Sequence, residues 1–133
     1  MSTIISPERQ AGLAGKRASQ FSGIVHAYVV MPSTDGVSIT NVTFSPGART
    51  FWHRHEVGQI LQVLSGRGLL QSEGGTVRVI HAGDTVWIPA GERHWHGATP
   101  ETAMTHTAIS LGVTSLDGEV AEADYTAPAN RQA

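Results

Sequence analysis

The most informative segment of the chain is GARTFWHRHEVGQILQVLSG, residues 47–66. It contains the long, apolar stretch of residues 51–64 and has glycine at both ends, which is typical of a β-strand region. Because alternate side chains of a strand share a face, His53 and His55 should point the same way. If the strand continues, Gln59 and Leu61 lie on that same face. The segment therefore predicts a strand that directs several polar side chains to one side of a sheet.

A second histidine pair lies downstream in GDTVWIPAGERHWH, residues 83–96. The two-residue period of a strand again puts both members, His94 and His96, on one face. Two imidazoles from one strand and another from a second strand can bind one divalent ion if both strands line one cavity. A single histidine on a strand is more often a hydrogen-bonded core or surface residue. Two His-x-His pairs favour a metal site.

Short β-type segments separated by Gly/Pro turns, one of them at residues 65–66, fill most of the chain. Such spacing indicates an all-β sandwich or barrel, and no segment shows the pattern of a three-turn amphipathic helix. We expect one domain over residues 21–116, after a flexible N-terminal arm of residues 1–20. Residues 117–133 form an acidic, then Ala/Pro-rich C-terminal tail. The expected strands are residues 24–30, 37–44, 51–64, 68–72, 77–80, 85–88, 93–96 and 104–111.

Composition excludes several classes of function. Of 133 residues, 40% are hydrophobic and 15% are charged, and the net charge is −2 with a single lysine, Lys16. Intrinsic disorder would need more charge, and a nucleic-acid binder would need a basic face. The absence of cysteine excludes disulfides and thiolate metal sites. No apolar run approaches the ~18 residues of a membrane span. We therefore expect a cytoplasmic protein whose partner is a small molecule, not nucleic acid or a membrane.

The two histidine segments resemble the paired motifs of the cupin superfamily. The first motif is Gly, five residues, His-x-His, three or four residues, Glu, six residues, Gly. The second is Gly, five residues, Pro-x-Gly, two residues, His, three residues, Asn. This chain matches them with Gly47, His53, His55, Gln59 and Gly66, and then with Gly83, Pro89, Gly91 and His94.

Two positions depart from these motifs: Gln59 replaces glutamate, and Ala98 replaces the final asparagine. The resemblance implies an all-β cupin-type jelly-roll β-barrel. It also implies a metal held by His53, His55, Gln59 and His94. A glutamine oxygen is neutral, so the site's formal charge is +2, whereas a glutamate ligand would make it +1. The ion should then be a stronger Lewis acid and be held less tightly. Alternatively, Gln59 is a polar core residue beside a three-histidine site.

Other polar residues are expected around the metal. His96 shares a face with His94, and His106 shares one with Ser110. A histidine beside a metal can act as general acid or base, or it can simply hydrogen-bond a ligand. We expect His106, or else His96, to transfer a proton. Candidate substrate-pocket residues, which packing alone explains equally well, are Thr40, Val42, Phe44, Leu61, Trp87 and Ser110.

The resemblance extends to small bacterial cupins that act as manganese-dependent hydroxynitrile lyases. It is carried by PGARTFWHRH at residues 46–55, GQ at 58–59, GERHWHGATP at 91–100 and TAMTH at 102–106. It implies reversible cleavage of a cyanohydrin to a carbonyl compound and HCN, with pocket histidines at His96 and His106. Ser110 stands where those lyases are expected to have a larger polar residue, and Leu111 follows where they are polar.

The metal and the reaction stay open at the level of sequence. Three nitrogens and one oxygen suit Mn(II), favoured by the resemblance, but also Fe(II), Co(II), Ni(II) or Zn(II). An iron version of the site could instead be a dioxygenase acting on a diketone or catechol-like molecule. A third alternative is a non-catalytic small-molecule binding protein, which would need no acid/base histidines. We also expect a homodimer or a larger homo-oligomer, through the apolar strand within residues 21–30.

Overall fold

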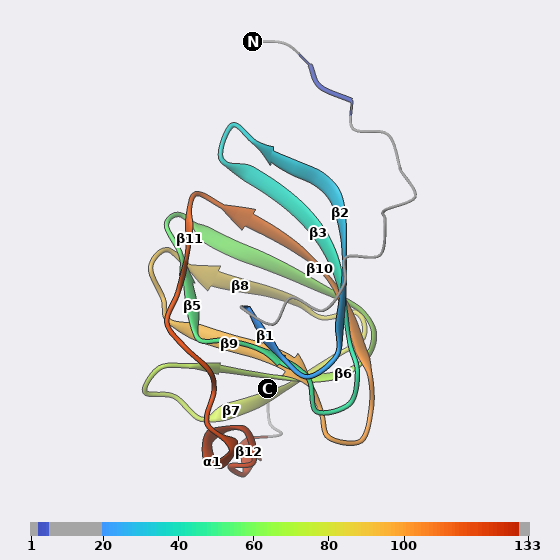
Figure 1. Ribbon diagram of the computed structural model, residues 1–133, viewed down its shortest axis with the longest axis vertical. Helices are drawn as coiled ribbons and strands as arrows, with labels where there is room; N and C mark the ends of the chain where they lie inside the picture. Colours follow the sequence, from blue (N-terminus) through green and yellow to red (C-terminus); the bar gives the residue numbers. More distant parts are fainter. Residues whose placement is uncertain (1–2, 6–19, 131–133) are drawn as a thin grey trace.

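The computed structural model describes residues 3–5 and 20–130, and these form a nearly all-β barrel (Figure 1). The expected N-terminal arm thus lies almost entirely outside the described residues. The described part contains one short helix, α1 (Glu122–Tyr125), and none that is long and apolar enough to cross a membrane. The strands are β1 (Phe21–Ser22), β2 (Val25–Thr34), β3 (Val37–Phe44), β4 (Arg49–Thr50), β5 (His53–His55), β6 (Gly58–Ser72), β7 (Val77–His81), β8 (Thr85–Pro89), β9 (His94–Ala98), β10 (Met104–Leu111), β11 (Thr114–Leu116) and β12 (Ala129–Asn130).

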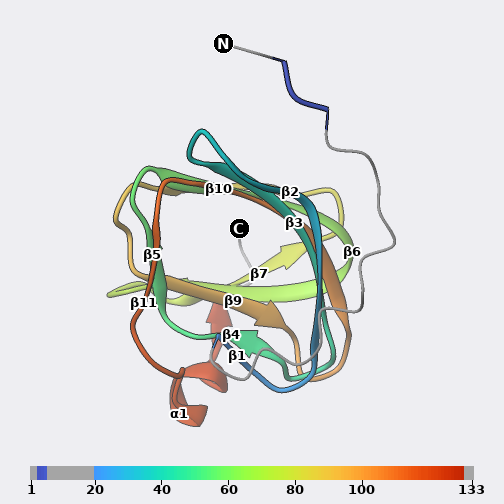
Figure 2. The same ribbon diagram turned by 45° about the horizontal axis from the view of Figure 1, so that its top comes forward.

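The barrel consists of two sheets that share β6. The five-stranded sheet has the order β2-β3-β10-β6-β8, and the second sheet has the order β1-β4-β9-β6-β7-β12. Residues 58–66 of β6 pair with β10, whereas residues 68–72 pair with β9. In Figure 2 the five-stranded sheet lies across the top, and β5 and β11 close the side of the barrel. The expected all-β barrel is confirmed.

The predicted turn at residues 65–66 is wrong, because β6 continues through it. Gly66 has φ +76°, and a Cβ atom there would collide with the carbonyl of Ala103. The glycine therefore lets one strand bend from the first sheet into the second without a loop. A related difference concerns β2, which extends past Pro32 to Thr34. Pro32 lies where the register between β2 and β3 is irregular, between Met31 and Thr34, and it has no paired residue in β3, so its missing N–H costs no ladder hydrogen bond.

Hydrophobic side chains form two clusters, one on each side of the second sheet. The first fills the barrel between the sheets and includes Phe44, Leu61 and Met104. The second lies on the outer side and unites the C-terminal tail with the barrel. Tyr125 of α1 is buried there and donates a hydrogen bond from its hydroxyl to the Ala98 carbonyl, at 2.5 Å. Residues 117–130 therefore pack against the outside of the barrel.

Candidate metal centre and active site

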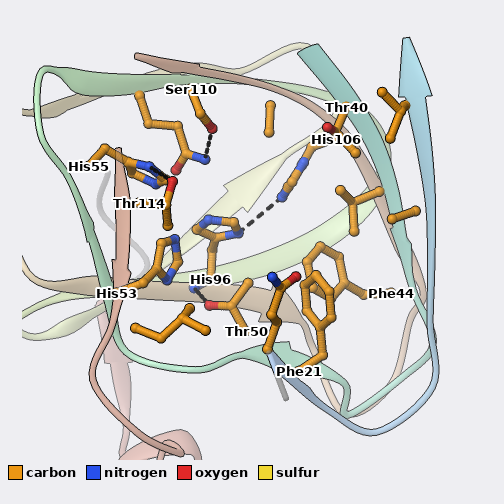
Figure 3. A pocket seen from close by; sticks show the side chains of 17 residues that line it. Phe21, Thr40, Phe44, Thr50, His53, His55, His96, His106, Ser110 and Thr114 are labelled. Atoms are coloured by element: carbon orange, nitrogen blue, oxygen red, sulfur yellow. Dashed lines mark hydrogen bonds between the residues drawn. The ribbon is translucent and has the colours of Figure 1, made fainter. Parts of the chain in front are cut away.

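A cavity of about 270 Å³ opens between the two sheets, and histidines from three strands reach it (Figure 3). Most of the other lining side chains are apolar or carry a hydroxyl group. Its lining comprises Gln20, Phe21, Ala27, Val29, Thr40, Val42, Phe44, Thr50, His53, His55, Gln59, His96, His106, Ala108, Ser110, Thr114 and Leu116.

The four predicted metal ligands lie together beside this cavity: His53, His55 and Gln59 line it, whereas His94 packs against them without lining it. Strand pairing places His53 of β5 directly opposite His94 of β9, and their ring centroids are 4.1 Å apart. The His55 ring lies 4.9 Å from His53 and 5.4 Å from His94. Gln59 of β6 brings its Oε1 to 3.1 Å from Nε2 of His94. All four residues are buried.

Hydrogen bonds from the outside orient these imidazole rings. Nδ1–H of His53 donates to the Phe51 carbonyl at 2.8 Å, and Nδ1–H of His94 donates to the Glu92 carbonyl at 3.0 Å. Nδ1 of His55 forms a hydrogen bond with Oγ1 of Thr114 at 2.9 Å. The carbonyl partners fix the tautomers of His53 and His94 and leave their Nε2 atoms with a lone pair for a metal. Nε2 of His55 is buried and has no hydrogen-bond partner among the residues that the structure describes.

The contact between His94 and Gln59 has the chemistry of a cation site. A neutral imidazole carries one N–H, and in His94 that proton is engaged with the Glu92 carbonyl. The Gln59 amide donates from Nε2 to Oγ of Ser110 at 3.0 Å, so its Oε1 faces His94. Two acceptor atoms therefore meet at 3.1 Å without a proton between them. A positive ion bound by both atoms relieves this repulsion, so the donor set fits a metal.

His96 and His106 form a second pair beside the candidate ligands. Nε2 of His106 lies 3.0 Å from Nδ1 of His96, and both rings are buried. Within the described part of the chain, the outer nitrogens, Nε2 of His96 and Nδ1 of His106, have no hydrogen-bond partner. Ring nitrogens of His53, His94 and His96 all lie within 4.8 Å of one another. This three-histidine group and the predicted ligand set share His53 and His94. The group contains His96 as its third histidine, whereas the predicted set contains His55.

Burial keeps the whole histidine cluster neutral. Desolvation is the largest cause that lowers the pKa of His53, His55, His94, His96 and His106, and neighbouring histidines lower it further for His53, His55 and His96. The pKa values of His55 and His106 fall to about 4. At neutral pH each ring therefore keeps a lone pair, which can bind a metal or accept a proton.

The structure places four of the six predicted pocket residues on the cavity wall: Thr40, Val42, Phe44 and Ser110. Leu61 is fully buried in the barrel core and does not line the cavity. Trp87 is the clear error, because its side chain is 57% exposed on the outer face of β8. Ile88 takes the buried position on that strand, and alternation forces its neighbour outward.

Two threonines of the site are missing from the sequence-based prediction. Thr114 holds the His55 ring, and Oγ1 of Thr50 accepts a hydrogen bond from the backbone N–H of His96 at 3.2 Å. Thr114 reaches His55 because β11 pairs with β5, although 59 residues separate the two in the chain. No local pattern marks either threonine, so only the strand pairing could have identified them.

Comparisons with known proteins bear on the family and the fold. The family model described as a cupin domain matches residues 40–110. Over 107 residues the chain is 48% identical to a protein named (R)-mandelonitrile lyase from Granulicella tundricola, with 79% of each chain covered.

Two solved structures share the fold. A cupin-like protein from Thermotoga maritima has a TM-score of 0.81 and 33% identity, over 89% of this chain and 95% of that one. A polyketide cyclase from Streptomyces resistomycificus has a TM-score of 0.71 and 16% identity, over 92% and 90% of the two chains. The predicted jelly-roll fold is thereby confirmed, and the chain belongs to the cupin family.

Proposed function

We propose that this protein is a hydroxynitrile lyase, which cleaves a cyanohydrin reversibly into an aldehyde or ketone and HCN. The proposal is supported by the 48% identity to a relative named (R)-mandelonitrile lyase. The observation that carries it is the buried His96–His106 pair beside the candidate metal ligands, with its two outer nitrogens unpartnered.

The residues present fit a divalent metal. His53, His55, Gln59 and His94 would hold it, with Mn(II) as the favoured ion, and the facing acceptors of Gln59 and His94 support this set. When bound, the metal supplies a Lewis acid that lowers the pKa of a nearby hydroxyl group.

The His96–His106 pair offers an acid and a base at the same time. Two neutral imidazoles carry two N–H groups, and one of these lies between the rings. In either direction of that hydrogen bond, one outer nitrogen carries a lone pair and the other carries a proton. The pair can therefore accept the hydroxyl proton of a cyanohydrin at one end and donate a proton at the other. We assign the base to His106.

The proposed step conserves protons within the pair. The substrate O–H bond breaks as the base takes its proton, and a C=O bond forms as the C–CN bond breaks. The departing cyanide takes the electron pair and receives the proton from the other outer nitrogen. The proton between the rings moves across, so both imidazoles end neutral with exchanged tautomers.

The cavity suits a small aromatic or branched cyanohydrin. About 150 Å³ is enough to bind benzene in a protein interior, so about 270 Å³ leaves room for a ring and the reacting atoms. Phe44 and Val42 offer apolar walls, and the Phe44 ring lies edge-on to His106 at 5.2 Å. The hydroxyl groups of Thr40 and Ser110 can hydrogen-bond the nitrile or hydroxyl group.

The test measures cyanide release from mandelonitrile and its synthesis from benzaldehyde and HCN, under argon and in air. We expect Mn(II)-loaded protein to catalyse both directions without oxygen, and chelator-treated protein to lose both. His106→Ala should lose both, whereas the control His81→Ala, on the surface, should keep them. Oxygen consumption with a diketone or catechol, and no cyanide release, would contradict the proposal and favour the dioxygenase alternative.

A further inference from the structure

Strand β1 adds an aromatic side chain, Phe21, to the wall of the cavity. Phe21 pairs with Thr50 of β4, and residues paired across antiparallel strands point to the same side of a sheet. Thr50 is buried and lines the cavity, and Phe21 lines it too. The next pair, Ser22 and Arg49, faces the other way, since the Arg49 guanidinium lies 4.2 Å from the ring centre of Tyr125 in the tail. The alternation along β1 therefore directs the Phe21 ring inward.

Backbone hydrogen bonds hold the segment around Phe21 against the barrel. The Gln20 carbonyl accepts a hydrogen bond from the N–H of Phe51 at 2.8 Å. On the other side of Phe21, the Ile24 carbonyl accepts one from the N–H of Ser45 at 3.0 Å. Phe21 is thus a fixed part of the cavity wall, although it comes directly after the N-terminal arm expected from the sequence.

Phe21 is the outer member of a line of ring contacts that leads to His106. The Phe44 ring is fully buried, and its centroid lies 5.2 Å from that of His106. The Phe21 ring is only partly buried and meets Phe44 edge-on, with centroids 6.0 Å apart. Figure 3 shows the two phenyl rings together on the side of the cavity away from His53 and His55. An aryl group that extends outward from His106 along this wall contacts Phe44 first and Phe21 second.

The mouth of the cavity is apolar beside Phe21. Val29 of β2 and Leu116 of β11 line the cavity, yet they are 44% and 45% exposed, so they lie at its opening. The histidines that line the cavity are buried and therefore lie deeper. Exposed apolar side chains that gather around a pocket are typical of a ligand-binding surface. The cavity thus has a polar reacting end and an apolar outer end.

We propose that Phe21 determines which cyanohydrins this protein accepts, because its ring limits the length of the aryl group. The reacting group in this inference rests on the proposed function, whereas the apolar wall does not. A cavity of about 150 Å³ holds benzene, so about 270 Å³ holds one aromatic ring and the reacting atoms. A fused second ring would extend to the Phe21 side chain. Phe21→Ala removes one phenyl group at that point and frees space for about one more ring.

The experiment measures binding of two unreactive alcohols, benzyl alcohol and 2-naphthylmethanol, to the full-length Mn(II)-loaded protein by calorimetry. The wild type should favour the one-ring probe. A change of one methylene group in an apolar pocket alters selectivity about 10-fold or more, so Phe21→Ala should raise the relative affinity for the two-ring probe at least about 10-fold. Phe21→Trp should shift the ratio the other way, and it keeps the test valid if the alanine variant does not fold. Ile24→Ala is the control, because Ile24 lies in the same segment but not on the cavity wall.

Turnover gives a second measurement. The ratio of kcat/KM for the 2-naphthyl counterpart of mandelonitrile to that for mandelonitrile should rise by the same factor in Phe21→Ala, with unchanged metal content. Absence of cyanide release in every variant would contradict the proposed lyase function, and the binding ratio would still test Phe21. The inference on Phe21 would be overturned by an unchanged binding ratio in both Phe21 variants or by an equal change in Ile24→Ala. A wild type that binds neither alcohol would also overturn it, because the apolar wall would then receive no aryl group.

Discussion

Acidification should destabilise the metal-free protein through its histidine cluster, and His106 allows the effect to be quantified. Burial lowers the pKa of His106 from 6.5 to about 4. Between these values the unfolded chain binds a proton at this residue and the native protein does not. Stability therefore falls as the pH falls below about 6.5, and the loss from His106 is complete below about 4. The full shift corresponds to about 3 kcal/mol in the free energy of unfolding.

The assay is urea denaturation with a chelator present, at a series of pH values from neutral to mildly acidic. His106→Ala should flatten the dependence of unfolding free energy on pH by about 1.4 kcal/mol per pH unit near pH 5. The lost packing lowers stability without a pH dependence of its own, and the lost repulsion between His106 and its neighbours His53 and His96 flattens the curve in the same direction. A His106→Ala curve parallel to the wild type would refute the reasoning.

Three further predictions concern the metal and the reaction. Gln59→Glu should bind the metal more tightly and turn over more slowly, because the added negative charge offsets part of the ion's field. Calorimetry of metal binding and turnover rates check this. Unchanged metal affinity would mean that Gln59 is not a ligand. Thr114→Val removes the hydrogen bond to Nδ1 of His55 and should weaken metal affinity about 10-fold or more, in a titration that Thr126→Val leaves unchanged. His106→Ala should lower turnover by about 10²–10⁴-fold in both directions with full metal content; loss of the metal would make His106 a ligand.

Local sequence is sufficient for much of the barrel and for the histidine pairs. Residues 37–44 largely alternate between apolar and polar, and residues 104–111 are a short β-type segment next to a glycine, so β3 and β10 follow from local sequence. The same period puts His53 with His55 and His94 with His96. The hydrogen bonds that orient His53 and His94 are local too, since each acceptor lies two residues upstream.

The rest depends on strand register, which local sequence does not contain. Alternation along β8 separates Val86 and Ile88 from Trp87 but does not say which set faces inward, hence the error at Trp87. Whether His55 or His96 joins His53 and His94 depends on distances between strands. The bend at Gly66 was predicted as a turn because glycine with positive φ occurs both in turns between strands and in bends within one strand.

Through the alternation of His94, Trp95 and His96, strand β9 connects the candidate site to the C-terminal tail, which does not line the cavity. His94 and His96 face the barrel interior, whereas Trp95 packs on the other side against Tyr125 of the tail, with ring centroids 5.7 Å apart. The tail is therefore a support behind the strand that carries the candidate ligands. Random mutagenesis for altered cyanohydrin selectivity should return substitutions at residues 117–130 as well as in the cavity. A chain shortened after Leu116 should lose metal affinity although every ligand is retained.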